Sequence, residues 1–197
     1  MLINLPNVLT LSRIAAIPVL VALFYVEGDG ARWAACLLFV AACVTDYFDG
    51  YLARAYDQIS PFGRFLDPIA DKLLVAALIL MLVAFGRIAG LLVLPALIIL
   101  CREILVSGLR EFLAGLNVGV PVSRLAKYKT TLQMVALGFL IVGDAGPPSL
   151  QIETIGAVGL WVAALLTIVT GFDYLQTGLR HMAAPAAARE PGRASGS

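Results

Sequence analysis

Four aspartates, Asp46, Asp49, Asp67 and Asp71, are the residues of this chain whose type and spacing could do chemistry. They follow the pattern D-x2-D-G-x2-A-R-x8-G-x3-D-x3-D inside a chain that is otherwise almost entirely apolar. Carboxylates are costly in or beside hydrocarbon, and hard oxygen ligands suit Mg²⁺ or Mn²⁺. Two divalent cations would neutralise the gathered carboxylates and leave positive charge for a phosphate. The pattern therefore predicts a metal site that receives a substrate phosphate.

The spacing of the aspartates predicts that they meet. Asp46 and Asp49 are three residues apart, and Asp67 and Asp71 are four apart, so each pair shares one face of a helix. The first pair closes the second long apolar segment, and the second pair opens the third. We expect the connection between the two segments to fold back and bring both pairs together at one edge of a membrane.

Other residues of the pattern are suited to holding a phosphate or a nucleotide. Gly50 has no side chain, which allows a ligand to approach the backbone. Arg54 follows one turn later and can bind phosphate. Ser60 offers a hydroxyl in the connection, and Gly63 permits a tight bend before the third segment.

The composition is that of an integral membrane protein. The chain has 197 residues, 60% of them hydrophobic and 14% charged, with a mean hydropathy of +0.92. Soluble domains carry about 25% charged residues. The formal net charge is only +1, which gives no reason to expect a nucleic-acid partner.

Apolar runs and the breakers between them predict an all-α protein with six transmembrane helices. A spanning helix needs about 20 mostly apolar residues. We expect no cleaved signal peptide, because no Lys or Arg precedes the first run. The expected spans are Val8–Val26, Ala31–Ala55, Asp67–Phe85, Gly90–Ala114, Arg124–Gly143 and Glu153–Tyr174.

Basic residues predict the orientation of these spans. With six spans both termini lie on one side, and of the 14 Lys and Arg only Arg32 and Arg87 fall on the other. Cytoplasmic connections carry the excess of Lys and Arg. We therefore expect both termini and the aspartates to face the cytoplasm. Residues 1–180 form one membrane-embedded domain in this interpretation, and residues 181–197 form a disordered cytoplasmic tail.

A second polar group consists of Arg102, Arg110, Lys127 and Lys129. Arg102 stands well inside the fourth apolar segment, where an unpaired charge is costly. One interpretation is an internal ion-pair network that includes the adjacent Glu103. The other is a pocket for an anionic phosphate. The sequence leaves both open.

Several stretches together give the chain a resemblance to the CDP-alcohol phosphotransferase family of membrane enzymes. The aspartate pattern matches the family motif position by position, with Thr45 where the family often has Ser before the first Asp. The resemblance covers about residues 4–180. The supporting stretches are 4–13, 66–72, 102–111 and 127–130.

The resemblance implies an activity and roles for the aspartates. Family enzymes transfer a phosphatidyl group from CDP-diacylglycerol to an alcohol and release CMP. By the resemblance, Asp46, Asp49 and Asp67 would bind two divalent cations, either Mg²⁺ or Mn²⁺. Asp71 would touch the second cation and act as the general base. The residues that would hold the CDP moiety are Gly50, Arg54, Ser60, Asn7 and Thr10.

The likeness is greatest to the branch of the family whose acceptor is glycerol 3-phosphate. The acceptor phosphate would then bind Arg110 and Lys127 foremost, with Arg102 and Lys129 nearby. The resemblance also implies a CDP-alcohol phosphotransferase-like fold, a homodimer surrounded by membrane lipid, and a place in a bacterial inner membrane.

Two kinds of alternative remain at this point. A sister enzyme could use inositol phosphate, serine or phosphatidylglycerol as the acceptor, although a neutral acceptor would not need so many cations. A divalent-cation transporter could use the aspartates as an ion path. It predicts acidic residues at mid-depth in several spans, often in repeated halves, and the sequence shows neither. A purely structural assembly subunit gives no reason for the aspartates.

Overall fold

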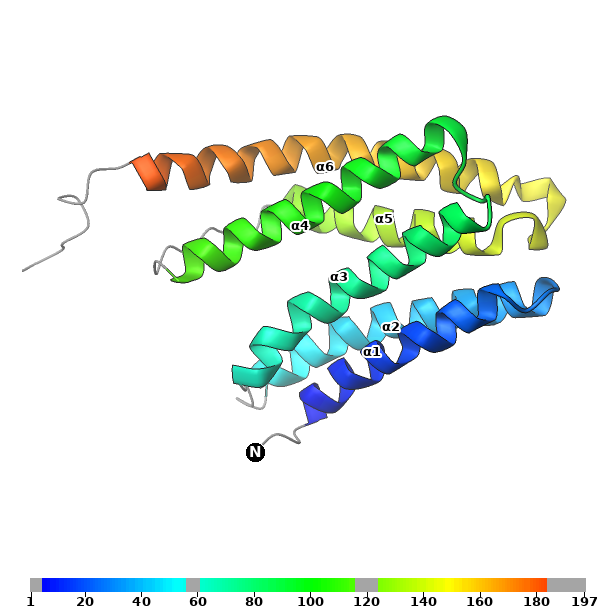
Figure 1. The fold of residues 1–197 in the computed structure, drawn as a ribbon, viewed down its shortest axis with the longest axis horizontal. Helices are drawn as coiled ribbons and strands as arrows, with labels where there is room; N and C mark the ends of the chain where they lie inside the picture. The colour runs from blue at the N-terminus through cyan, green and yellow to red at the C-terminus, as the bar shows by residue number, and fades with distance from the viewer. Residues whose placement is uncertain (1–4, 56–60, 116–123, 184–197) are drawn as a thin grey trace, which may run out of the picture.

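The computed structural model is entirely helical in the residues that it describes, which are 5–55, 61–115 and 124–183 (Figure 1). The α-helices are α1 (Leu5–Phe24), α2 (Asp29–Ala55), α3 (Pro61–Ala84), α4 (Val93–Gly115), α5 (Arg124–Val142) and α6 (Ile152–Ala183). Short 3₁₀ turns at Gly90–Leu92, Gly143–Ala145 and Pro148–Leu150 join them. The expected all-α class and the number of long helices are confirmed.

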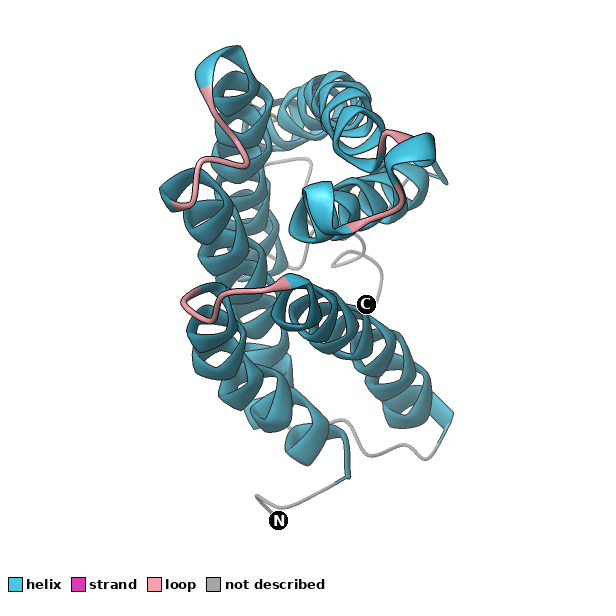
Figure 2. Ribbon diagram, turned by 90° about the vertical axis from the view of Figure 1, so that its right-hand side faces the viewer, coloured by secondary structure: helices cyan, strands magenta, loops and turns pink. Residues whose placement is uncertain are grey.

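The helices pack in two groups that run side by side. In one group α1 packs against both α2 and α3, and in the other α6 packs against both α4 and α5. Contacts of α2 with α5 and of α3 with α4 join the groups, whereas α3 and α5 touch only sparsely. The described connections all lie at one end of the bundle and face the viewer in Figure 2. The beginnings of α1 and α3 and the ends of α2 and α6 lie at the opposite end (Figure 1).

Four stretches are long and apolar enough to cross a membrane, which makes this a multi-pass membrane protein. They are Asn7–Phe24, Gly90–Gly115, Leu125–Ala145 and Pro148–Gln176. Helices α2 and α3, which carry the aspartates, are not among the four. Six spans therefore remain a prediction. Large apolar side chains such as Leu37, Leu80 and Phe172 are each 66% exposed, as lipid-facing residues would be.

Small residues bring α5 and α6 close together. A Cβ on Gly156 would lie 2.9 Å from Cγ of Leu140, and one on Gly159 would lie 3.1 Å from Cβ of Ala136. Membrane helices commonly associate through such small residues, because these let the backbones approach. The resulting α5–α6 contact is the most extensive between any two helices described.

Helix α3 begins earlier than the sequence predicted. The expected third span started at Asp67, but α3 starts at Pro61, so Asp67 and Asp71 lie inside the helix and Pro68 is an internal proline. Gly63 was expected to permit a tight bend before the third segment, but it lies inside α3, which begins at Pro61. Proline is favoured in a first helical turn. Helix α6 is also longer than predicted: it continues to Ala183, and residues 184–197 lie outside the described part.

Polar contacts fasten the end of the bundle that holds Arg32 and Arg87. Arg32 forms an ion pair with Asp144, and Arg87 donates a hydrogen bond to the carbonyl of Ile141. The Arg87 guanidinium also lies 5.1 Å from the centre of the Phe24 ring. Burial lowers the pKa of Arg87, and the neighbouring charge of Arg32 lowers it further. These contacts join the two groups of helices at the end away from the aspartates.

Candidate active site

An arginine from α1 holds the first aspartate. The Arg13 side chain is fully buried, and its Nη1 lies 2.6 Å from Oδ1 of Asp46 on α2. A buried guanidinium requires an anionic partner, whereas the Asp46 side chain is 46% exposed and can still meet a ligand. The pair therefore fixes one oxygen of Asp46 and leaves the carboxylate accessible.

A threonine from the same helix holds the third aspartate. The Thr10 hydroxyl donates a hydrogen bond of 2.6 Å to Oδ1 of Asp67 on α3, and Thr10 is 0% exposed. Asn7, Thr10 and Arg13 are spaced by three residues and all are buried, so they form one polar stripe along α1. This stripe faces the aspartate-bearing helices.

The stripe was only partly predicted. Asn7 and Thr10 were expected to contact the CDP moiety, which remains a prediction, and Arg13 was counted only as a cytoplasmic charge. The signal that could have identified Arg13 was present. Three polar residues at helical spacing in an apolar helix must face other polar groups, because each is expensive against lipid.

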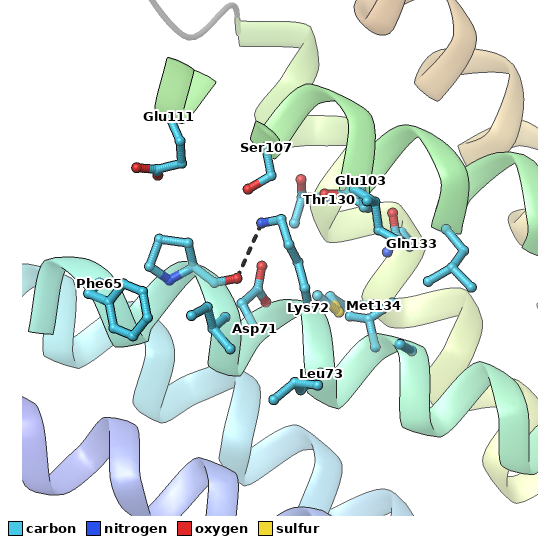
Figure 3. A pocket seen from close by; sticks show the side chains of 16 residues that line it. Phe65, Asp71, Lys72, Leu73, Glu103, Ser107, Glu111, Thr130, Gln133 and Met134 are labelled. Atoms are coloured by element: carbon cyan, nitrogen blue, oxygen red, sulfur yellow. Dashed lines mark hydrogen bonds between the residues drawn. The ribbon is translucent and has the colours of Figure 1, made fainter. Parts of the chain in front are cut away.

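Asp71 lies where two cavities meet. One cavity, of about 740 Å³, is bounded mainly by α2 and α5 and contains Asp46 and Asp71 in its wall. The other, of about 570 Å³, lies between α3, α4 and α5 and contains Asp71, Lys72 and Glu103 (Figure 3). Nζ of Lys72 lies 3.4 Å from the carbonyl oxygen of Pro68 and donates to it. The predicted base is thus accessible from both sides.

The remaining residues of the pattern are described less fully. Asp49, Gly50 and Arg54 lie in α2, where Asp49 follows Asp46 by three residues on the same face, but their side chains are outside the description. Ser60 lies outside the described residues altogether. Of the four aspartates, the structure describes the side chains of Asp46, Asp67 and Asp71. Asp46 and Asp71 line one cavity, and Asp67 is held by Thr10 of α1.

These carboxylates have the donor chemistry that a hard divalent cation requires. Among the side chains that the structure describes, no group of three His, Cys, Asp or Glu gathers tightly enough to form a complete metal site. Asp49 belongs to the same helical face as Asp46 and is not among those side chains. A metal site that includes Asp49 remains a prediction.

The predicted acceptor-side cations fall into different settings. Lys129 is 1% exposed and pairs with Glu103 of α4. Arg102 Nη1 lies 3.6 Å from Glu103, and its Nη2 donates to Thr170 Oγ1 at 3.3 Å. For these two cations the ion-pair interpretation describes the structure.

Arg110 and Lys127 are less enclosed. Both are exposed. Nη2 of Arg110 donates to the Tyr174 hydroxyl at 3.3 Å, and the guanidinium lies 5.5 Å from the centre of that ring. Sequence reasoning missed Tyr174, and it recognised Glu103 only as a neighbour of Arg102. Neither has a spacing signal, because their partners lie on other helices.

Comparison with known proteins shows the family to which this helical membrane protein belongs. The sequence model of the CDP-alcohol phosphatidyltransferase family matches residues 3–169. The chain belongs to this family, as the aspartate pattern predicted.

Individual relatives are similar over nearly their whole length. A protein of Rickettsia bellii is 53% identical over 173 residues, which are 88% of this chain and 94% of that protein. One of Shigella flexneri is 43% identical over 174 residues, covering 87% and 93%. One of Cereibacter sphaeroides is 37% identical over 214 residues, covering 91% and 97%. All three carry the name CDP-diacylglycerol–glycerol-3-phosphate 3-phosphatidyltransferase.

Proposed function

We propose that this protein transfers the phosphatidyl group of CDP-diacylglycerol to glycerol 3-phosphate, giving phosphatidylglycerophosphate and CMP. The observation that carries the proposal is 53% identity, over 88% of the chain, to a relative named for this reaction. The aspartate site agrees with it, because the reaction takes place at a pyrophosphate whose charge must be neutralised.

The chain's own residues would perform the proton transfer. A hydroxyl of the acceptor attacks the lipid-bound phosphorus, the bond from that phosphorus to the CMP oxygen breaks, and Asp71 takes the hydroxyl proton. Two divalent cations, Mg²⁺ or Mn²⁺, would be held by Asp46, Asp49, Asp67 and Asp71 and would supply charge stabilisation at the pyrophosphate. Gly50, Arg54 and Ser60 are proposed to hold the CDP moiety.

Helix α1 would give the site its rigidity. Arg13 and Thr10 each fix one oxygen of a proposed metal ligand. Groups that hold metal ligands in place commonly matter almost as much as the ligands themselves. Arg13 would therefore act through Asp46, and Thr10 through Asp67 as well as by contact with the CDP moiety. Asn7 is proposed to contact the CDP moiety.

We propose Arg110 and Lys127 as the direct ligands of the acceptor phosphate. Both are exposed, Arg110 on α4 and Lys127 on α5, and these helices together with α3 bound the cavity of about 570 Å³, although neither residue lines it. Arg102 and Lys129 are engaged with Glu103, which lines that cavity, and would act on the acceptor through it.

The proposed setting is a bacterial inner membrane with six spans and both termini in the cytoplasm. The start of α1 and the end of α6 lie at the same end of the bundle as the aspartate-bearing end of α2 (Figure 1). That arrangement supports a cytoplasmic site. A homodimer is proposed from the family resemblance, and chemical crosslinking in membranes would test it.

The deciding experiment is CMP release from CDP-diacylglycerol by the purified protein with Mg²⁺ or Mn²⁺. Glycerol 3-phosphate, inositol phosphate, serine and phosphatidylglycerol are compared as acceptors. Release that requires both a metal and glycerol 3-phosphate is expected. Release with another acceptor would keep the family chemistry and overturn the acceptor. If folded protein releases no CMP with any of these acceptors, the proposed activity is wrong and the transporter hypothesis is favoured instead.

A further inference from the structure

One buried amide on α5 is not used by the mechanism above. Gln133 is 1% exposed, and its Oε1 is buried without a hydrogen-bond donor among the residues described. Buried acceptors of this kind are uncommon, because an unpaired polar group has lost its hydration without gaining a partner. No described residue supplies this donor, so the oxygen points to one on a bound molecule.

Gln133 lies in the wall of the cavity that holds the proposed base. The cavity of about 570 Å³ takes Asp71 and Lys72 from α3, Glu103 from α4, and Gln133 from α5 (Figure 3). Cavities of about 300–1,000 Å³ are the usual size for small-molecule sites. A small acceptor in this space would meet Asp71 from one helix and Gln133 from another.

The nearby lysine and threonine donors each have an acceptor within the protein, which limits the kinds of group that could donate to Gln133. Lys129 precedes Gln133 by one helical turn on the same face and pairs with Glu103. Lys72 donates to the Pro68 carbonyl. The Thr130 hydroxyl donates to the carbonyl of Ala126 at 3.0 Å. A neutral hydroxyl on the substrate is the donor that suits a buried amide oxygen.

We propose that Gln133 Oε1 accepts a hydrogen bond from the secondary hydroxyl of the acceptor. This inference rests on the proposed function. Glycerol 3-phosphate carries a primary hydroxyl, which attacks, and a secondary hydroxyl on the adjacent carbon. Holding the secondary hydroxyl at α5 fixes the carbon chain and presents the primary hydroxyl to Asp71 on α3. Gln133 is thus a positioning residue that selects a vicinal diol phosphate over a simple hydroxyalkyl phosphate.

The test compares glycerol 3-phosphate with 3-hydroxypropyl phosphate, which has the same chain without the secondary hydroxyl. The purified enzyme should prefer glycerol 3-phosphate in kcat/KM by at least about 10-fold, because a site built around a hydroxyl discriminates against its absence. In Gln133→Met the preference should fall below about 3-fold. The loss should come from the reaction with glycerol 3-phosphate, with the analogue's rate retained.

Two further variants separate positioning from folding. Gln133→Glu keeps acceptor oxygens at the same place and should retain the preference. Gln176→Met makes the same kind of change at an exposed position of α6 and should leave kcat/KM unchanged for both phosphates. Equal losses with both substrates in Gln133→Met would assign Gln133 to the structure of the bundle and overturn the inference.

The unmodified enzyme provides a test that no variant's folding can obscure. Equal kcat/KM for the two phosphates would overturn the role of Gln133 while leaving the proposed function in place. No lipid product from glycerol 3-phosphate, together with turnover of a different acceptor, would instead overturn the proposed function itself.

Discussion

Replacing Thr10 by valine should weaken the binding of divalent cations. Valine has nearly the shape of threonine and lacks the hydroxyl that donates to Asp67 at 2.6 Å. Thr10 is completely buried, so water cannot replace the donor. Asp67 would then be free to turn away from the orientation in which it binds a cation.

The size of the effect follows from the type of bond. A hydrogen bond to a charged group contributes about 1.5–3 kcal/mol, and each 1.4 kcal/mol corresponds to about a tenfold change in an equilibrium constant. The cation concentration that gives half-maximal activity should therefore rise by about 10- to 100-fold, the range commonly seen when the support of a metal ligand is removed. The KM for glycerol 3-phosphate should change little, because Thr10 lies on the side of α1 that faces the aspartates.

The assay is the initial rate of CMP release as a function of Mn²⁺ or Mg²⁺ concentration. Thr10→Ser retains a hydroxyl and should behave like the unmodified enzyme. If Thr10→Val keeps the same metal dependence, the hydrogen bond does not position a metal ligand, and the reasoning about the α1 stripe is refuted. A rise in the KM for CDP-diacylglycerol alone would favour direct contact with the CDP moiety.

Three further changes test other parts of the site. Asp71→Asn should abolish turnover while CDP-lipid binding, measured by equilibrium competition, remains; normal turnover would rule out Asp71 as the base. Arg110→Ala should raise the KM for glycerol 3-phosphate by about 10-fold or more, as expected for a lost charged contact, and equal effects on both substrates would place Arg110 in a structural role with Tyr174. Glu103→Gln leaves the buried Lys129 without its anionic partner and should destabilise the protein by about 3–5 kcal/mol, seen as a lower Tm in detergent; Glu111→Gln, on an exposed part of the same helix, is the control, and equal Tm values would contradict the pairing.

The helices were predictable because each is an apolar run, and hydropathy records that directly. The ends of the helices were harder to predict. The start of α3 was missed because Pro61 and Gly63 can end one helix or begin another, and only the packing of α3 against α1 decides between these outcomes. The extension of α6 past Tyr174 is helical without being strongly apolar, so a search for spans stops too early.

The shared helical face of each aspartate pair was predictable from spacing, because residues three or four apart lie on one face whatever the fold. Metal binding by the aspartates stays a prediction. The residues that hold the aspartates in place were not predictable from spacing. The pairing of Arg13 with Asp46 depends on the register of α1 against α2, which no local pattern encodes. The acceptor side shows the same limit: the sequence gives the charges of Glu103 and Lys129 but not their separation, so a network and a pocket looked alike.

The small residues between α5 and α6 fix these helices in one register, so Gln133 cannot slide along the helix that carries Tyr174. On the other side, Arg13 and Thr10 tie α2 and α3 to α1. The bundle therefore has two halves, each held by its own contacts: one carries Asp71, and the other carries the residues proposed to bind the acceptor. A change confined to the half formed by α4, α5 and α6 should mainly raise the KM for the acceptor, as predicted for Arg110→Ala. A shift of one half relative to the other would change the distance between Asp71 and the acceptor hydroxyl. It should therefore slow turnover with every acceptor.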